Sequence, residues 1–65
     1  MTTAAAAELT VTGEHISRYR ERVAVIARTL SSGDHDDIVA ALFEAERALR
    51  TAGRAVDRAT KLLSA

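Results

Sequence analysis

The sequence predicts an all-α fold, an antiparallel helical hairpin formed by residues 1–65 as a single domain. Three observations favour it. Apolar residues in the second half recur at alternating steps of four and three, the spacing of a helix packed along another helix. Residues 16–30 show the same spacing. The connection between these stretches, residues 31–34, is short and polar, so the second helix must turn back along the first.

Length and composition bound the possible fold and function. A chain of 65 residues forms a small core, and natural proteins of this size usually need disulfides, a metal or association for stability. There is no cysteine, which excludes a disulfide framework and a thiolate zinc site. Association is the remaining way to stabilise the chain.

The formal net charge is zero, which gives no general attraction to nucleic acid or to a membrane surface. Apolar runs are too short to span a bilayer. The first twelve residues have no basic segment followed by an apolar stretch, as a secretory signal would. We therefore expect a cytoplasmic protein without membrane contact.

The first twelve residues carry conflicting signals. The alanines at positions 4–7 favour a helix, whereas residues 9–12 alternate apolar and polar and are rich in β-branched side chains, which is typical of a strand. Gly13 interrupts either pattern. We expect residues 1–12 to be irregular or frayed, as chain termini often are.

The first helix is expected over residues 13–32. Thr12 suits its N-cap, and Gly33 suits the left-handed position after its end. The apolar stripe of this helix steps by three and four residues, through Ile16, Tyr19, Val23, Ile26 and Leu30.

The second helix is expected over residues 34–64, with Asp34 as its N-cap. Its apolar residues form a predicted self-association seam of Ile38, Leu42, Ala45, Leu49, Ala52, Val56, Ala59, Leu62 and Leu63. The small residues Ala45, Ala52 and Ala59 would let neighbouring helices approach closely, because the distance between helix axes follows side-chain size.

Two arguments predict a homodimer that forms a four-helix bundle. The second helix is longer than the first by roughly eleven residues, about 16 Å, so its apolar end lacks cover unless residues 3–12 are also helical. Residues 34–46 carry five acidic and no basic side chains, whereas residues 47–65 carry five basic and one acidic. Antiparallel copies would set opposite charges side by side. The same polarity also complements the helix dipole, and an apolar seam alone does not distinguish a homomeric from a heteromeric bundle.

No residue set indicates an enzyme, a metal site or a cofactor. The serines lack triad partners, and a hairpin offers no deep pocket. His35 stands among three aspartates, but their spacing suits the start of a helix better than a metal. Val39 and Phe43, one turn apart and off the seam, either pack under the loop or form a candidate partner patch.

The sequence favours a non-enzymatic protein–protein interaction or regulatory module that self-associates through its second helix. The alternative is a small dimeric nucleic-acid-binding regulator, similar in architecture to Rop-type RNA-binding bundles. It would use a ribbon of basic residues, Arg47, Arg50, Arg54, Arg58 and Lys61. Zero net charge and the lack of interleaved aromatic residues favour the first hypothesis.

Overall fold

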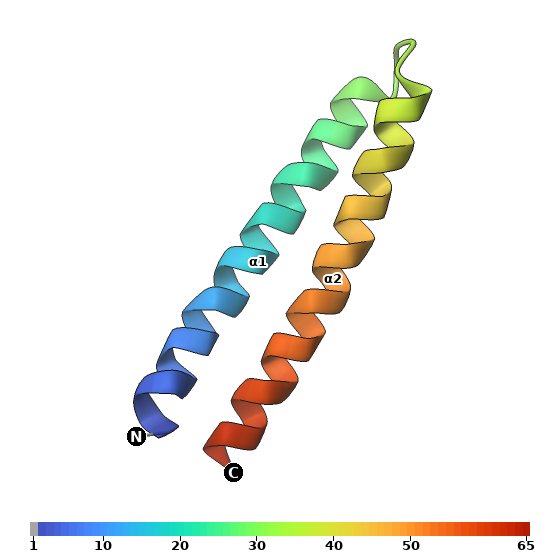
Figure 1. Ribbon diagram of the computed structural model, residues 1–65. Helices are drawn as coiled ribbons and strands as arrows, with labels where there is room; N and C mark the ends of the chain where they lie inside the picture. Colours follow the sequence, from blue (N-terminus) through green and yellow to red (C-terminus); the bar gives the residue numbers. More distant parts are fainter. Residues whose placement is uncertain (1) are drawn as a thin grey trace.

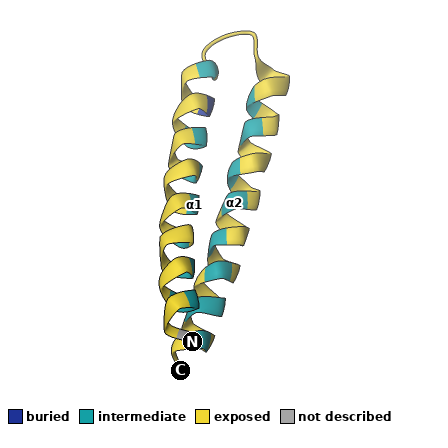
Figure 2. Ribbon diagram, turned by 60° about the vertical axis from the view of Figure 1, so that its left-hand side comes forward, coloured by how far each residue is buried: buried dark blue, intermediate teal, exposed yellow. Residues whose placement is uncertain are grey.

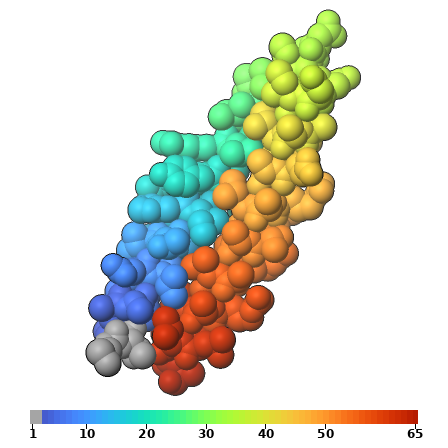
Figure 3. All heavy atoms as spheres, viewed as in Figure 1, coloured from blue at the N-terminus to red at the C-terminus, as the bar shows by residue number. Residues whose placement is uncertain are grey.

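The protein consists of two antiparallel helices joined by a short loop (Figure 1). A computed structural model describes residues 2–65. Helix α1 spans Thr2–Leu30 and helix α2 spans Asp36–Ser64, with 29 residues each. Both termini lie at one end of a rod whose Cα atoms extend over 50 × 14 × 11 Å, and the atoms of the two helices meet along the rod (Figure 3). The prediction of an all-α helical hairpin is confirmed.

Each helix turns one row of partly buried residues toward the other (Figure 2). On α1 this row consists of Leu9, Gly13, Ile16, Arg20, Val23, Ala27 and Leu30. On α2 it consists of Val39, Leu42, Glu46, Leu49, Gly53, Val56, Thr60 and Leu63. Both rows alternate steps of three and four, as in a coiled coil. We call the two rows together the hairpin seam.

Glycine and alanine on the seam bring the helices close together. A Cβ added to Gly53 would lie 3.5 Å from Ile16 Cγ2, and one added to Gly13 would lie 3.8 Å from Val56 Cγ1. Ala27 is fully buried, the one such residue among residues 3–65. The close approach is therefore made by these three residues and not by the alanines expected from the sequence.

The predicted stripe of the first helix is only partly turned inward. Tyr19 and Ile26 lie outside the seam, 51% and 50% exposed, and Arg20 and Ala27 take their places. A seam between only two helices has water along both edges. The aliphatic stem of Arg20 can therefore pack in the seam while its charged end reaches solvent.

The expectation of an irregular N-terminal segment was wrong for residues 2–12, because α1 begins at Thr2. Met1 lies outside the described residues. The alanine run sustains the helix, and the Thr10 and Thr12 hydroxyls donate hydrogen bonds to the carbonyl oxygens of Ala6 and Glu8, at 2.9 and 2.8 Å. Thr12 is thus inside the helix, not at its N-cap.

The two helices are equal in length, so the expected mismatch does not exist. Val56 and Leu63 are half-buried against the N-terminal part of α1, whereas Leu62 stays exposed. Helix length therefore supplies no argument for a second copy of the chain. A second copy could contact only the surface that the hairpin leaves uncovered.

The loop differs from the predicted one at both ends. The amide of Gly33 donates to the carbonyl oxygen of Leu30 at 3.2 Å, and no glycine among residues 2–65 has a positive φ. The N-cap of α2 is His35, with φ −130° and ψ 35°, and not Asp34. The His35 side chain makes no capping bond; instead Asp37 Oδ1 accepts a hydrogen bond from the Ile38 amide at 2.8 Å. Negative charge at this end of the helix complements its dipole.

Candidate interaction surface

An unbroken row of apolar side chains runs along α2 beside the hairpin seam. It alternates steps of three and four and consists of Ile38, Ala41, Ala45, Ala48, Ala52, Ala55, Ala59 and Leu62. All are exposed except Ala59, which is half-buried; Ile38 is 47% and Leu62 74% exposed. We call this row the α2 outer face. It has the spacing with which a helix packs along a second helix, and α1 leaves it uncovered.

Tyr19 and Ile26 of α1 border the same side of the hairpin. Each directly precedes a seam residue of α1, just as Ile38 and Ala45 directly precede seam residues of α2. In an antiparallel pair, the positions that precede the core residues of the two helices lie on one side of the seam. Apolar side chains from both helices therefore share this side of the molecule.

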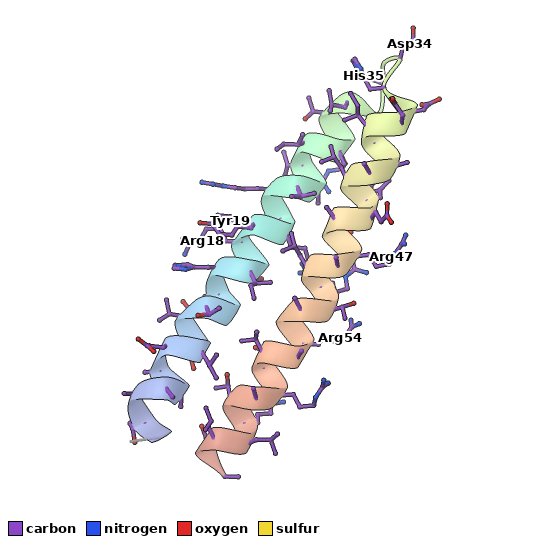
Figure 4. All side chains as sticks on the ribbon, in the orientation of Figure 1. Arg18, Tyr19, Asp34, His35, Arg47 and Arg54 are labelled. Atoms are coloured by element: carbon purple, nitrogen blue, oxygen red, sulfur yellow. The ribbon has the colours of Figure 1, made fainter. Side chains whose placement is uncertain are left out.

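Tyr19 lies on the flank of α1 and does not point between the helices (Figure 4). Its ring centroid is 6.4 Å from that of His15. The guanidinium carbon of Arg22 lies 5.8 Å from the Tyr19 centroid, within the range of a cation–π interaction. Two neighbours on its own helix thus support an aromatic ring that is half open to water.

The predicted self-association seam divides between two surfaces. Four of its members, Leu42, Leu49, Val56 and Leu63, belong to the hairpin seam and pack against α1. The others, Ile38, Ala45, Ala52, Ala59 and Leu62, belong to the α2 outer face. The prediction therefore needs correction for the first four, which α1 already covers. The predicted seam thus combines residues of two neighbouring rows of α2, which face different surfaces.

The candidate partner patch of Val39 and Phe43 lies partly in the hairpin seam. Val39 is half-buried in the hairpin seam. Phe43 is 43% exposed and directly follows the seam residue Leu42, which places it on the edge of the seam opposite Ile38. Val39 and Phe43 are neighbours one turn apart on α2, and Phe43 is the more exposed of the two.

The five basic residues of the ribbon, Arg47, Arg50, Arg54, Arg58 and Lys61, are all exposed on α2. Arg47 projects from the side of α2 away from α1 (Figure 4). Arg50 Nη2 lies 3.2 Å from Glu46 Oε1, an ion pair one turn apart. Asp57 lines the same hollow between the helices as Arg50 and Arg54. Acidic side chains thus interrupt the positive charge of the ribbon.

No group of three histidine, aspartate or glutamate side chains converges as metal ligands would, as far as the chain is described. His35 lies beside Asp34 in the loop, whereas His15 belongs to α1 (Figure 4).

Within residues 2–65, neither helix carries an apolar stretch of the length and hydropathy needed to cross a bilayer. The α2 outer face remains the main unexplained feature of the surface.

No protein-family model matches this chain, and comparisons with curated proteins and with solved structures found no match. The sequence contained every member of the α2 outer face, but it did not show that Tyr19 and Ile26 border that face. A second possible stripe of the first helix, through Arg20 and Ala27, could have indicated this. A helix that buries this stripe turns Tyr19 and Ile26 outward.

Proposed function

We propose that this chain is a non-enzymatic protein–protein interaction module that self-associates through the α2 outer face and thereby scaffolds or regulates a larger assembly. The observation that carries the proposal is the row of exposed apolar residues along α2. Among residues 3–65, Ala27 is the one residue that the hairpin buries fully. Contiguous exposed apolar surface tends to mark interaction sites.

Energetics support the same proposal. Complete burial of a leucine or isoleucine side chain stabilises a protein by roughly 1.5–3 kcal/mol. In the hairpin, Leu62 is 74% exposed and Ile38 is 47% exposed. Much of this stabilisation is therefore available only when another chain covers the α2 outer face. A small chain without disulfides depends on such a contribution.

The test is a single charge placed on the α2 outer face. Ala48 and Ala40 are both exposed alanines of α2, but Ala40 lies off the face. We expect Ala48→Glu to reduce the mass measured by light scattering to that of one chain, because association would bury the carboxylate. Ala40→Glu, the matched control, keeps the mass of the unaltered protein. Equal masses for the two variants would contradict the use of this face.

Binding of nucleic acid through the basic ribbon is the second candidate, favoured by the exposure of all five basic side chains. It predicts retention on a DNA column that falls steeply with salt. Arg47→Glu combined with Arg54→Glu should abolish retention, whereas Arg18→Glu combined with Arg28→Glu on α1 should reduce it less. If the two double variants lose retention equally, DNA binds through nonspecific attraction to positive charge, and the ribbon is not a binding site.

A further inference from the structure

We propose that the α2 outer face is covered by the same face of a second copy of this chain, antiparallel to the first, with a two-fold axis at the level of Arg50. This inference rests on the self-association proposed above and adds its geometry. The partner is thus another α2 helix of this protein, and the product is a four-helix bundle of two hairpins.

The order of residues on the α2 outer face is symmetric about position 50. Ile38 and Leu62 each lie twelve residues from it, and Ala48 and Ala52 each lie two residues from it. The alanines between them form pairs in the same way. An antiparallel copy centred on Arg50 therefore sets Ile38 against Leu62 of the second copy, and alanine against alanine throughout the middle.

This pairing suits close packing. A two-fold axis requires one surface to be complementary to itself, and the α2 outer face has small residues in the centre and one large residue at each end. Helix axes can approach to about 8 Å where the contact residues are small. The large residues at the ends then close both ends of the interface, at Ile38 and Leu62, which are exposed in the hairpin.

Charge complementarity selects the antiparallel copy over a parallel one. The acidic part of the second half of the chain, residues 34–46, would lie beside the basic part of the second copy, residues 47–65. Glu44 and Arg58 each directly precede a residue of the α2 outer face. In the antiparallel pair, Glu44 comes within about two residues, roughly 3 Å along the axis, of Arg58 of the second copy. A parallel copy would set like charges together.

The direction of the face fits a bundle of four helices. At 3.6 residues per turn, the centre of the α2 outer face lies roughly 100° around the helix from the centre of the hairpin seam. This is close to the right angle between the two neighbours of a helix in a square bundle. Each α2 would therefore contact its own α1 on one side and the second α2 on the other.

The bundle also accounts for Tyr19. Because Ile16 lies opposite Gly53, Tyr19 lies at the level of position 50, where the two-fold axis passes. The flank of α1 that carries Tyr19 then faces the same flank of the second α1. The half-exposed ring would be covered near the axis by the other copy.

Disulfide cross-linking tests the geometry, because the chain has no cysteine of its own. Ala45→Cys and Ala55→Cys lie five residues on either side of position 50. The antiparallel dimer brings position 45 of one copy to position 55 of the other, whereas two cysteines at position 45 lie about 15 Å apart along the axis. A disulfide needs Cα atoms within about 7 Å. Mild oxidation should therefore link the mixed chains at least tenfold faster than either variant alone.

The outcomes separate the geometry from the proposed function. If each variant links to itself faster than to the other, the copies are parallel and the inference is overturned, while self-association stands. If linking is no faster than for the off-face control Ala40→Cys and the protein has the mass of one chain, both are overturned. Preferential mixed linking supports both.

A charge exchange provides an independent test. Glu44→Arg or Arg58→Glu alone should weaken dimerisation at least tenfold, because each sets like charges together at positions 44 and 58 of the two copies. The double variant should restore dimerisation, because opposite charges then face each other again. Arg47→Glu is the control and should have a smaller effect, because Arg47 lies roughly 130° around the helix from the centre of the face, whereas Glu44 lies roughly 75° from it. Absence of rescue in the double variant would overturn the pairing of Glu44 with Arg58.

Discussion

Gly53 lies inside α2, and the helix continues through it without a break. Glycine in a helix interior costs about 1 kcal/mol relative to alanine. A Cβ at this position would meet Ile16 Cγ2 at 3.5 Å, an ordinary van der Waals separation. We therefore expect Gly53→Ala to raise the free energy of unfolding by about 0.5–1 kcal/mol, measured by urea denaturation at one fixed protein concentration.

Gly13 provides the comparison for this prediction. A Cβ there would lie 3.2 Å from Asp57 Oδ1, so the carboxylate would have to move. Gly13→Ala should therefore stabilise the protein less than Gly53→Ala. A loss of stability in Gly53→Ala would mean that the added Cβ lies closer to Ile16 Cγ2 than 3.5 Å.

Tyr19 is the one tyrosine of the chain, which has no tryptophan, so its fluorescence reports on a single site. It is 51% exposed in the hairpin, and dimerisation would cover it. We expect quenching by acrylamide to decrease as the protein concentration rises. In Ala48→Glu, which should stay a single chain, quenching should not depend on concentration. If quenching is equally constant in the unaltered protein, Tyr19 lies outside the interface.

Among the elements, the N-terminal part of α1 has the clearest testable role, because it covers the C-terminal part of α2. Leu9 is half-buried in the hairpin seam, whereas Val11, two residues further along, is exposed. We expect Leu9→Ala to lower the free energy of unfolding by about 1–2 kcal/mol, less than the 2–5 kcal/mol typical of a fully buried leucine. Val11→Ala should change it much less, in the same urea denaturation. Equal effects would mean that residues 2–12 do not pack on α2.

The two helices and their antiparallel order could be predicted from the sequence, because helical periodicity and a short polar connection act locally. The start of α1 could not. Thr12 and Gly13 suit a helix start, yet a threonine hydroxyl can also bond to the preceding turn, as it does at 2.8 Å to Glu8. The glycine is accommodated because it lies where α2 passes close by. Only the packing of the two helices decides between these uses.

The orientation of α2 was also ambiguous in the sequence. The row that begins with Leu42 faces α1, and either of two neighbouring rows can join it. Hydropathy favours the row of Ile38 and its alanines. The structure instead turns Glu46, Gly53 and Thr60 toward α1.

Each of these three residues is tolerated in the hairpin seam for a reason that hydropathy does not measure. Glu46 forms an ion pair with Arg50, and the Thr60 hydroxyl donates to the carbonyl oxygen of Val56 at 2.9 Å. Gly53 admits the side chain of Ile16. The more apolar row lies on the surface, and the pattern alone therefore could not separate the candidate interaction site from the core.

For the whole molecule, the hairpin buries little by itself, since Ala27 alone among residues 3–65 is fully covered. A protein whose folded state is stabilised by a second copy becomes more stable as its concentration rises. We expect the midpoint of thermal unfolding, followed by circular dichroism, to rise with protein concentration. In Ala48→Glu the midpoint should be lower and independent of concentration, whereas Ala40→Glu should behave like the unaltered protein.

The most direct test of the account is the mass of the unaltered protein by sedimentation equilibrium over a hundredfold range of concentration. Coverage of the α2 outer face by a second copy predicts the mass of two chains at the upper concentrations and a fall toward one chain on dilution. The mass of a single, fully helical chain at every concentration would contradict it.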